Sequence, residues 1–211
     1  MISRPHIRLD LLGLKGFSLI ELLVVITIIA MVAVFTVPAF NSVTTAGSIE
    51  NSADQIVGAL GLARQSAIGK NRPVEVRFYE VPADGWTNDF RALQLFEIAE
   101  SGSANPLTKV LKLKTPSVIS RDTGLSTLLD AGRAKNWSSN DPQIPLPGFG
   151  STYSCRVFRF RSSGATDLPV SAKWHLTVVD AHHPGSAAQP PTNFATVWVE
   201  PATGIVKVLR P

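Results

Sequence analysis

The sequence is poor in cysteine and in charged residues. Cys155 is the one cysteine among 211 residues, which excludes an intrachain disulfide and a cysteine-ligated metal cluster. Charged residues make up 17% of the chain, and the formal net charge is +4. Residues 1–16 contribute +2 of that excess, from Arg4, Arg8 and Lys15 against Asp10. The remainder is therefore nearly balanced, and its charge does not imply a strong field for nucleic acid.

Charge is almost missing from one long apolar segment near the N-terminus. Between residues 17 and 40 the clearly polar side chains are Ser18, Glu21, Thr27 and Thr36. As a helix, residues 17–37 would measure roughly 31 Å, which matches a bilayer core of about 30 Å. Basic residues before such a segment favour keeping that end in the cytoplasm. The pattern predicts a single membrane-spanning helix, with the rest of the chain on the far side.

Two ordinary interpretations of this segment leave Glu21 unexplained. A secretory signal peptide has an apolar region of about 7–15 residues before a small-x-small site. Val37-Pro38-Ala39 resembles such a site, but the run before it is longer than that. A plain membrane anchor fits the length, yet an intramembrane carboxylate is costly unless it is paired. Glu21 therefore calls for a partner.

The stretch Gly16-Phe17-Ser18-Leu19-Ile20-Glu21, followed by an apolar helix with Pro38, resembles the type IV prepilin signal. The resemblance implies that a prepilin peptidase cuts after Gly16 and that the new terminal Phe17 is N-methylated. It also implies that Glu21 acts in assembly and that Pro38 kinks the helix. Glu21 lies one helical turn from the Phe17 amine, within reach of it in the same or a neighbouring subunit. The helix dipole also favours an acid there, but does not explain the adjoining Gly-Phe.

After a bend or pause at Pro38, a second helical pattern is expected to resume by Ser48 and to stop between Gly69 and Pro73. Its apolar face follows the spacing i, i+3, i+4, i+7. The residues on this face are Ala53, Ile56, Val57, Leu60, Ala63, Ala67 and Ile68. The chain then divides into a leader (1–16), a transmembrane and assembly helix (17–38), its amphipathic continuation (39–72) and a β-rich head (73–211).

The head is predicted to be β-rich and mostly antiparallel, which makes the whole chain α+β. Alternating apolar residues predict strands at 74–81, 91–98, 110–114, 156–161, 174–179, 196–200 and 205–209. The turn at 201–204 predicts a C-terminal hairpin. Two polar loops are expected, at 125–154, with a helical turn within 125–134, and at 181–193.

The order of short motifs resembles the H-type minor pseudopilins of type II secretion and the T-type minor pilins of type IV pili. The matching pieces are Ala63-Arg64-Gln65-Ser66-Ala67, the strand after Pro73, Phe160 to Gly164, and the hairpin around Gly204. Residues 91–97 and the following Lys-Val-Leu-Lys-Leu also resemble the Verru_Chthon cassette protein D subgroup.

The resemblance implies a minor pilin or pseudopilin subunit that is held in the inner membrane and assembles with other subunits in a periplasmic filament. Its role would be to prime assembly, or to contact secreted cargo at the filament tip.

Candidate catalytic groups have simpler structural interpretations. The adjacent His182 and His183 lie in a polar loop, where solvation is expected rather than metal binding. His175 lies within a predicted strand, and a lone cysteine such as Cys155 is usually a small buried hydrophobe. Residues 146–151 lack the lysine and spacing of a phosphate-binding loop. The sequence therefore predicts no enzyme activity, cofactor or metal site.

A competing interpretation is a DNA-binding or adhesive minor pilin of a pilus or competence system. Arg156, Arg159 and Arg161 alternate with Phe158 and Phe160, which could pair phosphates and stack on bases. In a strand, however, the phenylalanines share a face with Arg156 and oppose the other two arginines. Phenylalanines in the core and arginines in solvent is the simpler expectation.

Overall fold

The computed structural model describes residues 16–83 and 86–210, without the side chains of residues 35–43 and 83–88. The chain divides into two compact units, one ending at Ser42 and one beginning at Val43. Since the described residues begin at 16, the expected leader (1–16) lies outside them, apart from Gly16.

A single helix, α1, runs from Leu19 to Lys70. The pause expected at Pro38 is wrong, because the helix is continuous through that residue. A proline removes one backbone N–H donor from the hydrogen bonds of a helix. The residues on both sides of Pro38 nevertheless remain helical. The kink expected at Pro38 stays a prediction.

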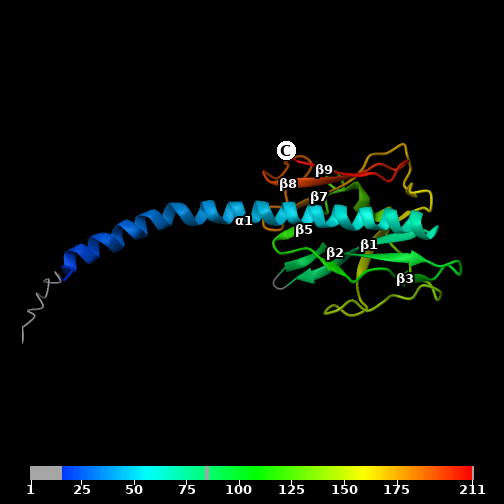
Figure 1. Ribbon diagram of the computed structural model, residues 1–211, viewed down its shortest axis with the longest axis horizontal. Helices are drawn as coiled ribbons and strands as arrows, with labels where there is room; N and C mark the ends of the chain where they lie inside the picture. Colours follow the sequence, from blue (N-terminus) through cyan, green and yellow to red (C-terminus); the bar gives the residue numbers. More distant parts are fainter. Residues whose placement is uncertain (1–15, 84–85, 211) are drawn as a thin grey trace, which may run out of the picture. The chain divides into compact units, whose positions relative to one another are not determined.

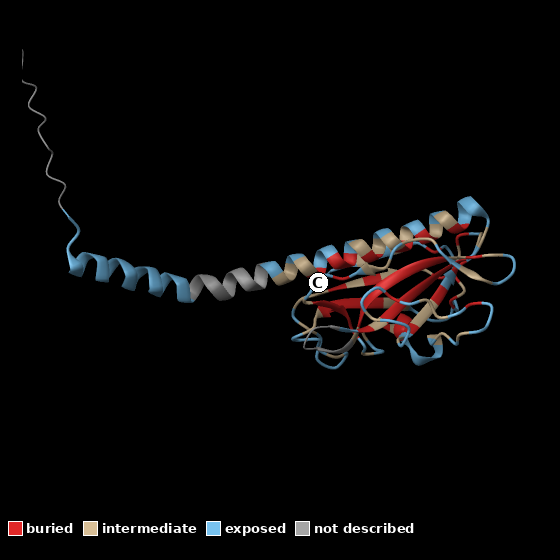
Figure 2. Cartoon of the chain, turned by 90° about the horizontal axis from the view of Figure 1, so that it is seen from below, coloured by how far each residue is buried: buried red, intermediate tan, exposed pale blue. Residues whose placement is uncertain are grey.

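Within the second unit, one stripe of α1 is buried against the sheet (Figures 1 and 2). The buried residues are Ile49, Ala53, Ile56, Leu60, Ala63 and Ala67. Their spacing alternates between four and three residues, which keeps them on one face. Asn71 ends the helix with a φ of 50°, a left-handed conformation typical of C-terminal caps. Helix α1 thus closes one face of the head.

Within the described residues the sheet has nine strands, and their pairing is antiparallel throughout. They are β1 (Val74–Ala83), β2 (Trp86–Ile98), β3 (Ala104–Pro106), β4 (Leu111–Lys112), β5 (Ser117–Ile119), β6 (Ser154–Phe160), β7 (Trp174–Asp180), β8 (Phe194–Val199) and β9 (Val206–Leu209). The main order is β6-β1-β2-β5-β7-β8-β9, and β3 and β4 also pair with β2.

The α+β class and the C-terminal hairpin are confirmed, and all seven expected strands are present. The strand expected at 110–114 shortens to Leu111–Lys112. Strands β3 and β5 were not expected, since each has only three residues and no alternating pattern. The helical turn expected in 125–134 is two short 3-10 helices, η1 (Thr127–Leu129) and η2 (Ala131–Arg133).

Apolar residues pack on both faces of the sheet. The inner face, which α1 covers, carries alternate residues of β1 such as Val74, Val76 and Phe78. The outer face carries a smaller cluster that includes Tyr79 and Phe96, and residues of the loop 125–154 pack on it. The long loop is therefore a second cover of the sheet.

Three motif pieces that lie far apart in the sequence meet at one junction. The Arg64 guanidinium donates from Nε to the Thr203 carbonyl oxygen at 2.9 Å. A Cβ on Gly204 would lie 2.0 Å from the Gly164 carbonyl oxygen and 3.2 Å from Cδ of Arg64. Gly164 and Gly204 have φ values of 83° and 66°, which favour glycine. The junction ties α1 to the turn after β6 and to the C-terminal hairpin.

We expect Gly204→Ala to destabilise the head more than Gly102→Ala does. Both positions have positive φ, but a Cβ at Gly102 would meet nothing within 4 Å. The left-handed conformation costs roughly 1–2 kcal/mol at either site. Overpacking against the Gly164 backbone adds about 1–3 kcal/mol for Gly204→Ala alone. Urea unfolding of the full chain measures the difference, and equal losses for the two variants would contradict the close packing of this junction.

Candidate functional site

The expected processing motif lies at the start of α1. Gly16, Phe17 and Ser18 precede the helix, and the Glu21 backbone N–H donates to Ser18 Oγ at 3.2 Å. Serine at this position satisfies one of the N–H groups that a helix start leaves without a partner. Glu21 occupies the first turn, where the helix dipole favours an acid. The cap thus fixes the helix start between Phe17 and Glu21.

The first part of α1 exposes its apolar side chains on every side (Figure 2). Phe17, Leu19 and Ile20 are 77%, 83% and 68% exposed, and such a continuous apolar surface indicates a site that other apolar groups cover. The expected membrane segment is 17–38, and its side chains are described as far as residue 34. Across the described residues, no helix is both long enough and apolar enough to cross a membrane.

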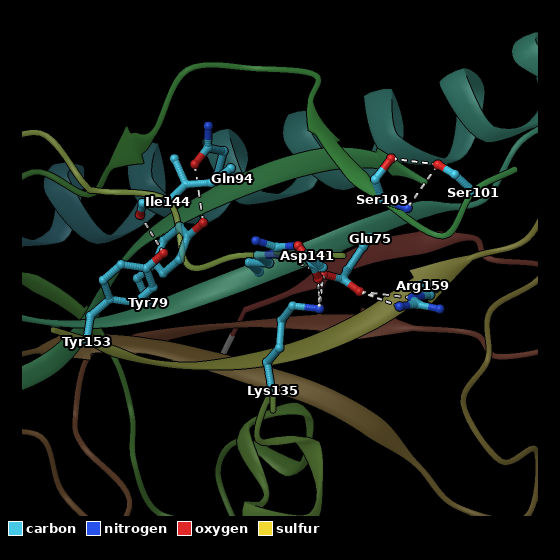
Figure 3. Close-up of polar contacts among 11 residues, drawn as sticks. Glu75, Tyr79, Gln94, Ser101, Ser103, Lys135, Asp141, Ile144, Tyr153 and Arg159 are labelled. Carbon is cyan, nitrogen blue, oxygen red and sulfur yellow. Dashed lines mark hydrogen bonds and ion pairs between the residues drawn. The ribbon is translucent and has the colours of Figure 1, made fainter. Parts of the chain in front are cut away.

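A second site, which the sequence did not predict, lies on the outer face of β1. Five charged side chains meet there, and Figure 3 labels four of them, Glu75, Lys135, Asp141 and Arg159. This charge cluster consists of Glu75, Arg77, Lys135, Asp141 and Arg159. Glu75 and Arg77 belong to β1 and are completely buried, Arg159 belongs to β6, and the other two belong to the loop 125–154.

Each carboxylate of the charge cluster contacts more than one cation. Glu75 accepts from Arg77 Nε at 2.7 Å and from Arg159 Nε at 2.9 Å, and Lys135 Nζ lies 3.2 Å away. Asp141 accepts from Arg77 Nη2 at 2.9 Å and also contacts Lys135. Because the loop supplies Lys135 and Asp141, these contacts fix the loop on the sheet.

Aromatic rings enclose the centre of the charge cluster. The Arg77 guanidinium lies 3.7 Å from the centroid of Phe96 and 4.8 Å from that of Trp137. Burial by itself would raise the pKa of Glu75, but Arg77, Lys135 and Arg159 outweigh it and hold that pKa below its ordinary value. The pKa of Asp141 is lowered in the same way, against burial, by Lys135 and Arg77. Both carboxyls are thus held in their charged form.

The three arginines in and just after β6 do not form one surface. Phe158 and Phe160 are buried in the inner core, and Arg156 is half-buried, with Nε donating to the Leu129 carbonyl oxygen at 3.3 Å. Arg159 points to the outer face and pairs with Glu75, while Arg161 is exposed. Arg156 and Arg159 are therefore both bound to groups of the head, although Arg159 remains exposed. The DNA-binding interpretation stays an untested hypothesis.

The remaining candidate groups have structural contacts. His175 stacks on Trp198 with ring centroids 6.4 Å apart, and its Nε2 lies 3.3 Å from the Gly124 carbonyl oxygen. His182 Nδ1 lies 2.7 Å from Asp180 Oδ1 on an exposed loop. Burial raises the pKa of Cys155 to about 12. Within the described residues, no group of three or more metal-binding side chains is arranged to hold an ion.

Comparison with known proteins defines the class of the N-terminal segment. Residues 15–37 match the model of the prokaryotic N-terminal methylation motif, which confirms the prepilin-type interpretation of this stretch. The match covers Gly16, Phe17 and Glu21. No curated protein matches the sequence.

Solved structures resemble the chain at low identity. The minor pseudopilin EpsH of the type 2 secretion system of Vibrio cholerae has a TM-score of 0.42 and 14% identity, over 78% of this chain and 98% of EpsH. The type IV minor pilin FimU of Pseudomonas aeruginosa has a TM-score of 0.44 and 13% identity, over 78% of this chain and 90% of FimU. At these values the motif at 15–37, rather than the structural similarity, carries the functional argument.

Because of the charge cluster, we expect the head to become less stable in acid. The folded pKa values of Glu75 and Asp141 lie below their ordinary values of 4.5 and 3.8. As the pH falls below about 4.5, the unfolded chain therefore binds more protons than the folded chain. The free energy of unfolding decreases until the pH lies below the folded pKa values as well. We expect the urea midpoint of the full chain to fall between about pH 5 and about pH 3.

The double variant Glu75→Gln, Asp141→Asn should show a smaller fall over the same pH range. It should also lose about 3–5 kcal/mol at neutral pH, because buried cations lose their partners. Glu100→Gln, at a carboxylate whose side chain is 90% exposed, serves as the control and should keep the slope of the parent. A double variant with the parent's slope would contradict a role for these two carboxyls.

Proposed function

We propose that this chain is a minor pilin or pseudopilin subunit of a type II secretion or type IV pilus-like machine. The N-terminal methylation motif at residues 15–37 is the observation that carries the proposal. The subunit is held in the inner membrane by residues 17–38, with its N-terminus in the cytoplasm and its head in the periplasm. Its role is structural rather than catalytic: it primes a filament or contacts cargo at the tip.

The exposed apolar surface of α1 supports the assembly role. Phe17, Leu22 and Ile29 are 77%, 59% and 61% exposed, and the run between them includes a single acid, Glu21. Lipid covers such a surface before assembly, and the helices of other subunits cover it afterwards. In an apolar environment a carboxylate is costly without a positive partner. The amine that cleavage creates on Phe17 is the cation we assign to Glu21, in the same or a neighbouring subunit.

Processing has a specific expected product. When the full chain is produced with an active prepilin peptidase, the mature protein should begin at an N-methylated Phe17, because Gly16 offers a backbone without a side chain to the protease. Mass spectrometry of the N-terminus measures this, and a peptidase with its active-site acids replaced provides the control. An intact Met1, or a terminus after Ala39, would refute the proposal.

Glu21→Val should separate insertion from assembly. The variant removes a charge from an apolar helix, so membrane insertion and cleavage should remain normal. Its incorporation into filaments should fall by about tenfold or more, equivalent to about 1.4 kcal/mol or more of lost pairing. Quantitative immunoblots of sheared filaments and membranes give the two amounts.

Glu50→Val is the matched control for this experiment, because it removes a carboxylate from the same helix outside the motif. It should assemble as the parent does. Equal incorporation of the Glu21 and Glu50 variants would rule out the pairing of Glu21 with the Phe17 amine.

A further inference from the structure

The two edges of the sheet differ in how they are closed. The outer edge of β6 is covered by the chain itself: the Lys135 N–H donates to the Cys155 carbonyl oxygen at 3.2 Å, and the Asp167 N–H donates to the Arg159 carbonyl oxygen at 2.9 Å. The Arg159 N–H in turn donates to the Asp167 carboxylate at 2.9 Å. The edge of the sheet at β6 therefore has its backbone groups largely paired.

Strand β9 forms the opposite edge, and it is open. Its partner in the sheet is β8, with Val206 opposite Val199 and Leu209 opposite Thr196. Across the described residues no strand lies beyond β9. An open edge presents backbone N–H and C=O groups that can pair with an added strand.

The side chains of β9 also favour contact on the side that faces away from the core. Val206 and Val208 pack against the inner core, so Lys207 and Leu209 point outward from the strand, and Ile205 directly precedes it. Ile205 and Leu209 are exposed large apolar residues, at 45% and 52%. The exposed Lys207 lies between them. The edge therefore presents a cation flanked by two apolar groups.

The neighbouring strands extend this outer surface. In the sheet register Lys207 lies opposite Trp198, which lies opposite His175, and Leu209 lies opposite Thr196. Trp198 is half-buried and stacks on His175, which holds the indole in place. The surface beside β9 therefore includes an indole that a ring contact supports.

We propose that the β9 edge binds an extended segment of a partner protein as an added antiparallel strand, with a carboxylate opposite Lys207 and apolar side chains near Ile205 and Leu209. Backbone pairing supplies affinity in this mode, and alternate side chains supply specificity. The inference concerns a partner of the head and would stand even if the assembly role failed.

Lys207 decides between this partner and a second copy of the chain. Two antiparallel β9 strands from two copies would bring their central lysines close together, and like charges in cross-strand positions are destabilising. Lysine on an edge strand commonly prevents unwanted pairing. Here Lys207 disfavours the pairing of two β9 strands and the binding of basic segments. An acidic segment is therefore the partner whose charge complements this edge.

Binding of designed peptides to the full chain in detergent micelles tests the proposal without requiring a filament. The first probe is a seven-residue peptide with threonine at odd positions and valine, glutamate and valine at the second, fourth and sixth positions. The second probe replaces the glutamate with lysine. We expect the glutamate probe to bind more tightly and to slow hydrogen exchange at residues 206–209, while β6 is unaffected.

A charge reversal makes the test specific. Lys207→Glu should weaken binding of the glutamate probe by about 3- to 10-fold and should reverse the preference between the two probes. Lys109→Glu makes the same change of charge at an exposed site between β3 and β4 and should leave both affinities unchanged. Because Lys207 is exposed, the variant is expected to fold.

Three results would overturn the proposal. One is the absence of binding by the glutamate probe, or protection that appears away from β9. Another is an equal effect of the two lysine variants. The third is protection of residues 206–209 that rises with protein concentration in the absence of any probe, which would assign the edge to a second copy of this chain.

Discussion

The structure of the head depends on the packing of one stripe of α1 against the inner face of the sheet. Alanines at 53, 63 and 67 let the helix approach closely, while Ile49, Ile56 and Leu60 fill the space between helix and strands. Burying an aliphatic side chain of this size is worth roughly 1.5–3 kcal/mol. The helix that begins with the methylation motif is therefore also a structural part of the head.

Because α1 occupies the inner face, the outer face needs a different cover, and the loop 125–154 provides it. The sheet places Glu75 and Arg77 beneath this loop, and the loop brings Lys135 and Asp141 to them. A buried ion pair adds little stability over apolar packing, but removing one partner is strongly destabilising. The charge cluster thus holds the loop in one arrangement, since displacing Asp141 would deprive Arg77 of a buried partner.

Sequence patterns predicted the elements well and the outer face poorly. Periods of two and of about 3.6 residues indicate which side chains share a face, and that was enough for the long strands and for α1. Glu75 and Arg77 alternate with valines, which is also the pattern of a solvated strand face. Their burial depends on Asp141, 64 residues after Arg77, a distance that no local pattern spans. Ile68 was expected in the core, but it is 45% exposed and lies instead against the turn at Gly164.

On the proposed function, the motif at the start of α1 would link processing to assembly through charge. In the uncut chain the Phe17 nitrogen belongs to a neutral peptide bond, so it cannot balance the carboxylate of Glu21. The proposed cleavage after Gly16 would convert that nitrogen into an amine and remove residues 1–16. In an apolar environment a separated charge is costly and a paired charge is much less so. On the function proposed above, the cut would create a cation one helical turn from Glu21, whereas the uncut chain would bring the acid to a contact between helices without that amine.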